Sequence, residues 1–435
     1  MSPLTVCKQS GVKYWSASKL RSGLAAKMGI GAIDQALLSG ANFIIGIIII
    51  RCVSKFDYGL YVFGFSAILL ASGLQDAVIN VQMSIIAPTM NSVQKKIFCS
   101  HLAVGQYVLW LPLSGLGVFT AWVLFRTAVF NTHEMTMAVV LSVAVPAIFL
   151  REFYRGLLFV NLQPFKVLLL DILYIVILFC LIFVFAYAFP SAMDILSFVA
   201  MGASSLIIGG VGLLGLLGAG WFEACRTGWL ASFSRCWVNG RWALLGVAVT
   251  WAQRQSYVYM LLILRGAENT AEVNAARLML MPVGLLLMSY GRIVVPQWAS
   301  DRCFGRADEI LRSARKILKY LLLAICSYAA ILLVSKERLI PRLFGRGYSG
   351  SCHYILLWGL IFIAQAVRTN LSLVLQVFEK FRYLGITNFG VMIVTVCASA
   401  LLIGLYNDAG SLLATLLGET LLALVFWLPV RRLGG

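Results

Sequence analysis

The stretch that decides the fold is VLLLDILYIVILFCLIFVFAYAF, residues 167–189, in which Asp171 is the only charged residue. As a helix it would rise about 35 Å, enough to cross the roughly 30 Å hydrocarbon core of a bilayer. The whole chain is similar in character, because 61% of its 435 residues are hydrophobic and only 12% are charged. Soluble domains are about 45–50% apolar and about 25% charged. This composition excludes an ordinary soluble enzyme and a disordered chain.

Eleven further apolar stretches flank this one, which predicts an all-α polytopic membrane protein with about 12 transmembrane helices. The twelve predicted spans are 29–50, 61–87, 102–125, 135–150, 167–189, 195–219, 242–264, 275–297, 317–335, 353–377, 383–405 and 409–430. The fourth is short and is expected to continue as helix into Arg151–Arg155. The apolar runs are continuous rather than alternating, which excludes a β-barrel. The connections are too short to hold a soluble catalytic or nucleotide-binding domain.

The distribution of Lys and Arg predicts the orientation. With the N-terminus in the cytoplasm, 23 of the 35 Lys and Arg fall on the cytoplasmic side and eight on the opposite side. Both termini are therefore expected in the cytoplasm. The net charge of +18 is better explained by this asymmetry and by contact with anionic lipids than by nucleic-acid binding. The N-terminal segment does not resemble a cleavable signal, because the apolar run after it is long enough to span.

The chain is predicted to consist of two six-helix lobes around a central cavity. The first span ends in four isoleucines and Arg51, and the seventh ends in a similar apolar run and Arg265. The next spans end near Pro88 and Pro296, at the same offset of about 210 residues. This repeat predicts lobes at 1–219 and 242–435, related by an axis along the membrane normal. The competing interpretation is the helix–loop–helix likeness that all polytopic proteins share.

The segment between the lobes, 220–241, is aromatic and basic. Trp229, Phe233 and Trp237 recur every four residues, which places them on one face of a helix. The segment is either a helix lying in the cytoplasmic interface or an ordinary connector. A second amphipathic stretch, 308–319, has acids at its start and cations at its end. It is expected to be a helix that leads directly into the ninth span.

Four arginines fall within predicted spans, all in the second half: Arg254, Arg277, Arg292 and Arg368. Charged residues at bilayer depth are costly and usually face a bundle interior or a wet cavity. Guanidinium groups grip phosphate or carboxylate through two hydrogen bonds, so these arginines predict a cationic cavity that binds an anion. On a straight helix, Arg277 and Arg292 would lie about 60° and about 22 Å apart, along one side. The alternatives are snorkelling to an interface or pairing with acids on neighbouring helices.

Four acids also fall within predicted spans: Asp34, Asp76, Asp171 and Glu419. Asp76 and Asn80 are four residues apart and share a helix face. Asp34, Asp76 or Glu419 could carry a coupling proton or sodium ion, or could instead be the counter-ion of an arginine. Asp34 is close enough to the cytoplasmic end to reach water, and Asp171 is expected at the interface.

Several motifs are missing, and their absence restricts the function. No Gly is followed by Lys, so there is no P-loop. We expect no cofactor, and energy from H⁺, Na⁺ or the membrane potential. The ten cysteines and three histidines show no metal-binding or disulfide spacing. No acidic cluster of the kind that transferases use for metal binding is present, so no catalytic residues and no covalent chemistry are expected.

Two stretches carry a resemblance to a known family. Residues 33–65 include Ile33-Asp34-Gln35 and continue through Arg51 to Phe56-Asp57-Tyr58-Gly59-Leu60-Tyr61. They resemble the opening of the polysaccharide-transport (Wzx-type) flippases of the multidrug/oligosaccharidyl-lipid/polysaccharide (MOP) exporter superfamily. Residues 339–348, with Leu343-Phe344-Gly345, are similar to that family's external signature between spans 9 and 10. The family often has an acid after this glycine, where this chain has Arg346.

The resemblance implies alternating access and a cationic lumen that moves an undecaprenyl-pyrophosphate-linked oligosaccharide from the cytoplasmic to the periplasmic leaflet. It implies a bacterial inner-membrane protein that serves surface polysaccharides such as O-antigen of lipopolysaccharide or exopolysaccharide, with a polysaccharide polymerase as a partner. The four intramembrane arginines match this role by location and not by a family motif. The alternative is a MATE-like multidrug/ion antiporter of the same fold, which would need a carboxylate-rich cavity.

Overall fold

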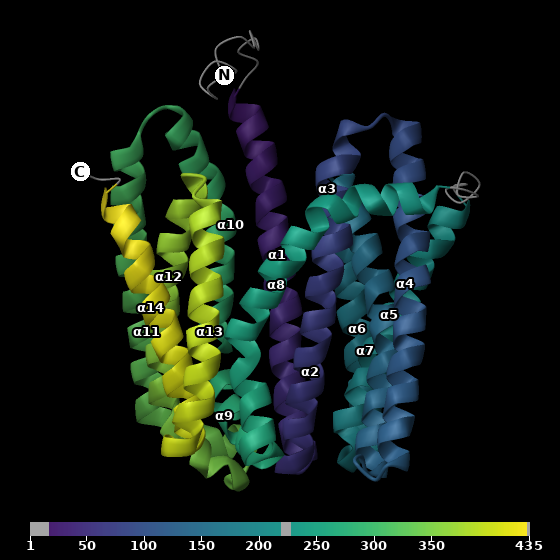
Figure 1. The fold of residues 1–435 in the computed structure, drawn as a ribbon, viewed down its shortest axis with the longest axis vertical. Coiled ribbons are helices and arrows are strands. Elements are labelled where there is room, and N and C mark those ends of the chain that lie inside the picture. Colours follow the sequence, from purple (N-terminus) through teal and green to yellow (C-terminus); the bar gives the residue numbers. More distant parts are fainter. Residues whose placement is uncertain (1–16, 219–227, 433–435) are drawn as a thin grey trace.

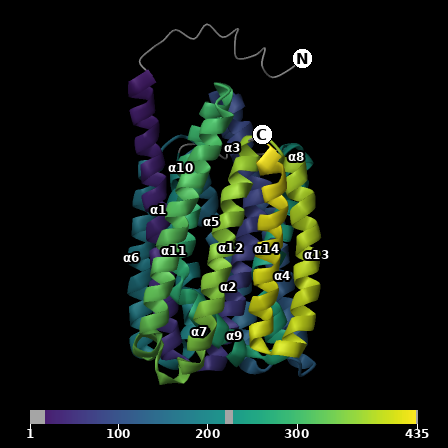
Figure 2. The same cartoon turned by 90° about the vertical axis from the view of Figure 1, so that its left-hand side faces the viewer.

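The computed structural model describes residues 17–218 and 228–432. Within these ranges every element is helical and no strand occurs, so the predicted all-α class is confirmed. The long helices run side by side, and α1 begins at the same end of the bundle at which α14 ends (Figures 1 and 2). We call this end the terminal face and the opposite end the distal face. Because the start of α1 and the end of α14 lie at the same end of the bundle, an even number of membrane crossings is expected.

The long helices are α1 (Ala17–Cys52), α2 (Lys55–Gln75), α4 (Ser92–Arg126), α5 (Thr132–Val160), α6 (Pro164–Ala188), α7 (Met193–Gly218), α8 (Trp229–Arg265), α9 (Ala267–Met279), α10 (Met281–Cys303), α11 (Ala307–Phe344), α12 (Tyr354–Val377), α13 (Phe381–Tyr406) and α14 (Asp408–Arg432). A π-helical turn, η2 (Asp76–Asn80), joins α2 to α3 (Val81–Ile86). Three short 3₁₀ segments complete the set: η3 (Ala87–Thr89), η4 (Pro190–Ala192) and η5 (Arg346–His353).

By length and composition, ten of the described helices can cross a membrane, or eleven if the bent pair α9–α10 is one span. The chain is therefore a multi-pass membrane protein. The difference from the twelve predicted spans lies in α8, whose C-terminal part holds the predicted seventh span. The polar run Gln253-Arg254-Gln255-Ser256 lowers the mean hydropathy there.

The most extensive helix contacts lie within each half of the chain. In the first half α5 packs against α7 and α1 against α6, and in the second half α12 and α13 pack against α14. Between the halves, α2 contacts α9, and α8 contacts α2, η2 and α4. Figure 1 shows α8 crossing obliquely from the α4 side of the terminal face to α9 at the distal face. The predicted lobe boundaries at 219 and 242 stay a prediction.

The segment expected to link the halves is partly helical and continuous with the next span. Of residues 220–241, those up to 227 lie outside the described residues. From Trp229 onward they form the first turns of α8. Trp229 and Phe233 lie over Gly105 of α4, and Ser232 Oγ lies 2.9 Å from His101 Nδ1. This end of α8 is thus packed on α4, while Trp237 is 46% exposed.

The predicted eighth span is not one straight helix. It is divided at Leu280 into α9 and α10, which are bent by 55° at the break. Arg277 therefore lies on α9 and Arg292 on α10, and the predicted placement of both along one side of a single helix is wrong. Pro282 enters α10 at its second position, where a missing backbone N–H is tolerated.

Residues 308–319 lie in α11, as predicted, and lead without interruption into the ninth span. The same helix then continues to Phe344. The stretch 336–352, which connects the predicted ninth and tenth spans, is therefore helical in its first half. Only η5 and its flanks connect α11 to α12.

Candidate functional site

Three of the four predicted arginines belong to one basic group in the second half of the chain. Arg254 on α8 lies within electrostatic range of Arg277 on α9 and of Arg368 on α12. Glu419 on α14 lies within the same range. The four side chains have a formal net charge of +2. Arg292 lies on α10, and its side chain is outside the described part of the structure.

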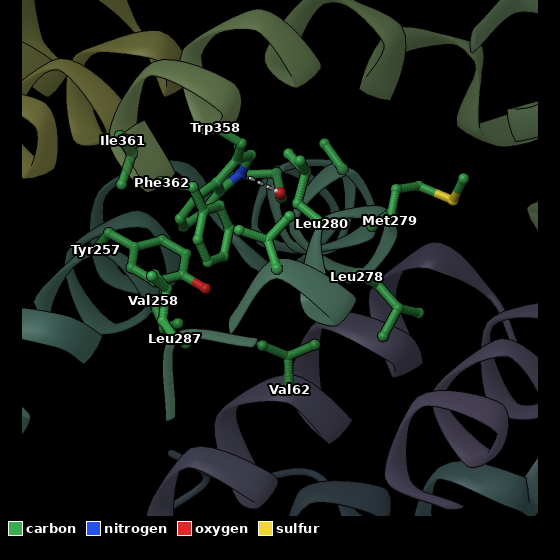
Figure 3. Close-up of a cluster of buried hydrophobic side chains, with 14 of the residues drawn as sticks. Val62, Tyr257, Val258, Leu278, Met279, Leu280, Leu287, Trp358, Ile361 and Phe362 are labelled. Atoms are coloured by element: carbon green, nitrogen blue, oxygen red, sulfur yellow. Dashed lines mark hydrogen bonds between the residues drawn. The ribbon is translucent and has the colours of Figure 1, made fainter. Parts of the chain in front are cut away.

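Arg277 is held between aromatic rings rather than reaching an interface. Its guanidinium carbon lies 5.6 Å from the ring centroids of both Tyr257 and Trp358, and Nη1 donates to the Tyr257 hydroxyl at 2.8 Å. Figure 3 shows these two rings in the apolar cluster around the break at Leu280, where Trp358 Nε1 donates to the carbonyl oxygen of Val273 at 2.9 Å. Cation–π contacts and the hydrogen bond fix the orientation of this guanidinium.

Arg368 and Glu419 form an ion pair between α12 and α14, Nε to Oε2. Both side chains are nearly buried, at 11% and 5% exposed. Glu419 thus takes the counter-ion role that was one of its two predicted alternatives. Arg368 Nη2 has no hydrogen-bond partner among the described residues, so one edge of this guanidinium is left unsatisfied.

Arg254 is the arginine of this group without a described partner. No hydrogen bond or ion pair joins it to any residue within the described ranges, and its side chain is exposed. Its neighbours on α8, Gln253 and Gln255, are each 7% exposed. Of these three residues only Arg254 keeps substantial accessible surface, although the surrounding helices enclose it. An exposed guanidinium among other cations is the group best placed to accept an anion.

A second ionic group in the first half of the chain was missed in the sequence. Arg155 on α5 donates through Nε to Asp171 of α6 at 2.7 Å and through Nη2 to Asp34 of α1. It also pairs with Glu152 at 3.3 Å. Asp34 and Asp171 are 1% and 0% exposed. Asp34 was expected to reach water and Asp171 to lie at the interface, and both expectations are wrong. Both carboxylates are buried in the bundle, where each pairs with Arg155.

Arg151 completes this acidic network, which we define as Asp34, Arg151, Glu152, Arg155 and Asp171. It pairs with Glu152, and its guanidinium lies 3.6 Å from the centroid of the Tyr174 ring. Three carboxylates and two guanidiniums give the network a formal charge of −1. The four arginines within the predicted spans all lie in the second half. The helix α5 continues through Arg151 and Arg155, as expected for the fourth span, and adds two arginines in the first half.

Asp76 differs from the other intramembrane acids because no arginine pairs with it in the described residues. Its side chain is exposed, and Oδ1 accepts from Asn80 Nδ2 at 2.6 Å across the π-helical turn. The predicted shared face of these two residues is therefore confirmed. Glu152 and Arg155 lie within its electrostatic range, so Asp76 borders the acidic network.

The two halves are in contact at the distal face. Lys55 at the start of α2 pairs with Glu272 of α9, and its ammonium lies 5.7 Å from the ring centroid of Tyr348. A Cβ at Gly59 would lie 2.0 Å from the carbonyl oxygen of Ala267, so the two backbones touch there and only glycine fits.

A chain of hydrogen bonds connects this distal contact to the basic group. Asn274 Nδ2 donates to the Tyr58 hydroxyl of α2 at 3.2 Å, and the Tyr257 hydroxyl donates to Asn274 Oδ1 at 3.2 Å. Arg277 then donates to Tyr257. An arginine of the basic group is thereby linked, through two polar side chains, to the other half of the protein.

The Lys55–Glu272 pair gives a charge-reversal test of the distal contact. We expect Lys55→Glu to lower the thermal unfolding midpoint in detergent, because it opposes two carboxylates. Since the pair is partly exposed, the coupling free energy is about 1 kcal/mol. The double variant Lys55→Glu/Glu272→Lys should regain most of the loss. If its loss equals the sum of the two single losses, the pair does not hold the halves together.

This arrangement is that of a multi-pass helical membrane protein whose two halves meet at the distal face. No family model matches the sequence, and no curated protein does either. Solved structures do match in fold. The lipid II flippase MurJ in its inward closed conformation superimposes with a TM-score of 0.68 at 12% identity, over 92% of this chain and 87% of MurJ.

Transporters of the MATE type match equally well. MATE in complex with MaL6 has a TM-score of 0.66 at 13% identity, over 93% of this chain and 95% of that one. A MOP superfamily transporter from Pyrococcus furiosus, described by the reverse polarity of its binding pocket, has a TM-score of 0.63 at 14% identity and 94% coverage of both chains. The fold is therefore that of the MATE and MurJ transporters of the MOP superfamily, and these neighbours are transporters rather than enzymes.

Proposed function

We propose that this protein translocates a lipid-linked oligosaccharide across a bacterial inner membrane by alternating access. The substrate headgroup is a pyrophosphate, and the polyprenyl tail, undecaprenol in the expected carrier, stays in the lipid. The terminal face is cytoplasmic, and the glycan leaves at the distal face for surface polysaccharide assembly, with a polymerase as the next partner.

The observation that carries this proposal is the charge of the group formed by Arg254, Arg277, Arg368 and Glu419. Its net charge of +2 matches a pyrophosphate diester, which carries two negative charges. Arg254 is exposed and unpaired within the described residues, so it supplies a guanidinium without first breaking an ion pair. Charge-assisted bidentate hydrogen bonds are the usual means by which arginine binds phosphate oxygens.

Energy for transport would enter through the first half of the chain. Asp34 forms an ion pair with Arg155, and Glu419 forms an ion pair with Arg368. Asp76 is therefore the coupling-ion candidate of choice, since it is exposed and its hydrogen-bond partner is the neutral Asn80. Contact of the basic terminal face with anionic lipids would fix the orientation.

A second candidate function, ion-coupled export of cationic drugs, is favoured by a different observation. The acidic network together with Asp76 carries a formal charge of −2, and carboxylates of this kind suit cations. The two candidates thus place the substrate in different halves of the protein.

The test is to delete the gene in its native host and extract the lipid-linked oligosaccharides. The proposal expects a completed, polyprenyl-linked glycan to accumulate and to return to the normal level when the wild-type gene is restored. An unchanged lipid pool with increased sensitivity to cationic drugs would overturn it in favour of the antiporter.

A further inference from the structure

A group of metal-ligating side chains lies at the distal face, apart from both ionic groups. It consists of Asp57 in the first turn of α2, His133 at the second position of α5 and Asp194 at the second position of α7. One ligand atom from each lies within 4.8 Å of the other two. His133 Nε2 is 2.6 Å from Asp194 Oδ2 and 3.5 Å from Asp57 Oδ1. The proposed transport reaction makes no use of these residues.

The burial of Asp194 shows that the group is incomplete as it stands. Its side chain is 0% exposed, and Oδ1 has no hydrogen-bond donor among the described residues. A buried carboxylate oxygen left without a partner is destabilising. The two carboxylates also outnumber the single imidazole, so a negative charge remains even if His133 is protonated. A cation between the three side chains would offset the negative charge, and Asp194 would satisfy Oδ1 as well by binding the cation through both carboxylate oxygens.

The orientation of Asp57 is already fixed by a further hydrogen bond. Ser54 Oγ donates to Asp57 Oδ2 at 2.6 Å, which leaves Oδ1 directed at His133. Metal-ligating carboxylates are commonly held in this way by groups that do not touch the metal. The chain therefore holds a preformed arrangement of one nitrogen and two oxygen ligands.

We propose that Asp57, His133 and Asp194 bind a divalent transition metal of the Zn²⁺ type. Imidazole nitrogen with carboxylate oxygen suits zinc, whereas Mg²⁺ and Ca²⁺ prefer oxygen ligands alone. Three protein ligands leave a fourth tetrahedral position for water. The metal would join the starts of α2, α5 and α7, and so fix the turn of α2 that also carries Lys55 of the distal contact.

The test uses the purified full-length protein in detergent, stripped of metal with a chelator and then titrated with ZnCl₂. We expect one equivalent to bind and to raise the thermal unfolding midpoint, while MgCl₂ has no effect. His133→Gln should weaken Zn²⁺ binding by about 100-fold or more, since loss of even an outer-shell partner costs about 10- to 100-fold. Asp57→Asn removes a partly exposed ligand, so it tests the site in a protein that keeps its core. His353→Gln, an exposed histidine outside the group, is the matched control and should bind as the wild type does.

Co²⁺ substitution separates this site from the chain's ten cysteines. The proposal expects a visible absorption spectrum of nitrogen and oxygen ligation that is lost in His133→Gln. It is overturned if no stoichiometric Zn²⁺ binds, if His133→Gln and Asp57→Asn bind as tightly as the control, or if the Co²⁺ spectrum shows thiolate ligation. None of these outcomes depends on the transported substrate.

Discussion

The Arg254→Ala variant is expected to reach the membrane at wild-type levels and to lose export of the lipid-linked oligosaccharide. Arg254 has no described partner whose charge would be stranded, so the fold should tolerate the change. Loss of a charge-assisted hydrogen bond costs about 1.5–3 kcal/mol, which corresponds to roughly a 10- to 100-fold weaker interaction with the pyrophosphate. Arg254→Lys keeps the charge but not the planar fork, and should retain part of the activity. The measurement is the accumulation of lipid-linked glycan in the complemented deletion strain.

Two comparisons make this result specific. Arg241→Ala alters another exposed arginine of α8, one that stacks on Trp242 at 5.6 Å, and should export normally. Arg368→Ala is expected to lose export as well, but with a lower protein yield, because it leaves the buried carboxylate of Glu419 unpaired. Normal export by Arg254→Ala at wild-type abundance would contradict the basic group as the substrate site.

The Arg155→Met variant is expected to be the most destabilised single substitution in the first half of the chain. Arg155 joins α5 to α1 and α6 through Asp34 and Asp171. Its removal leaves two buried carboxylates without a cation, and breaking a buried ion pair in this way costs about 3–5 kcal/mol. The measurement is the yield of monodisperse protein in detergent together with its thermal unfolding midpoint.

The matched rescue is Arg155→Met combined with Asp34→Asn and Asp171→Asn. It removes the stranded charges and should recover much of the lost stability, since replacing a whole buried ionic group is often tolerated. Arg126→Ala, an exposed arginine at the end of α4 that lies over Trp122, should behave as the wild type. A stable Arg155→Met single variant would mean that the network does not support the packing of α1 and α6.

The course of the membrane helices could be predicted from composition, because an apolar run of about 20 residues has few alternatives to spanning. The break at Leu280 was not predicted, although Pro282 was its signal. Hydrophobicity predicts one span from a continuous apolar run, whether or not the helix bends within that run. The error affected the predicted site, because the relative positions of Arg277 and Arg292 cannot be calculated from helix geometry when a break separates them.

The acidic network was missed for a related reason. The predicted fourth span ends at residue 150, and its helix was expected to continue into Arg151–Arg155, which α5 confirms. Because a 16-residue helix rises only about 24 Å, these two arginines belong to the span and not to the loop in which they were counted. The partners of Arg155 could not be identified from the chain alone, because Asp34 lies 121 residues away. The group of Asp57, His133 and Asp194 was missed for the same reason, since His133 and Asp194 are 61 residues apart.

In the proposed alternating-access cycle, the unbroken helix α8 would limit how far the two halves can move apart. With 37 residues, α8 is about 55 Å long. Its start packs on α4, and it also packs along α13 and α14 of the other half. Figure 1 shows α8 running across the terminal face before it turns toward α9. In the proposed cycle, separation of the two halves would therefore require α8 to lose its contact with α4 or to bend further. Gly246 has open space around its Cβ position, so we expect α8 to bend there most easily. In the proposed cycle, the length of α8, rather than the size of either half, would then limit how wide the terminal side can open.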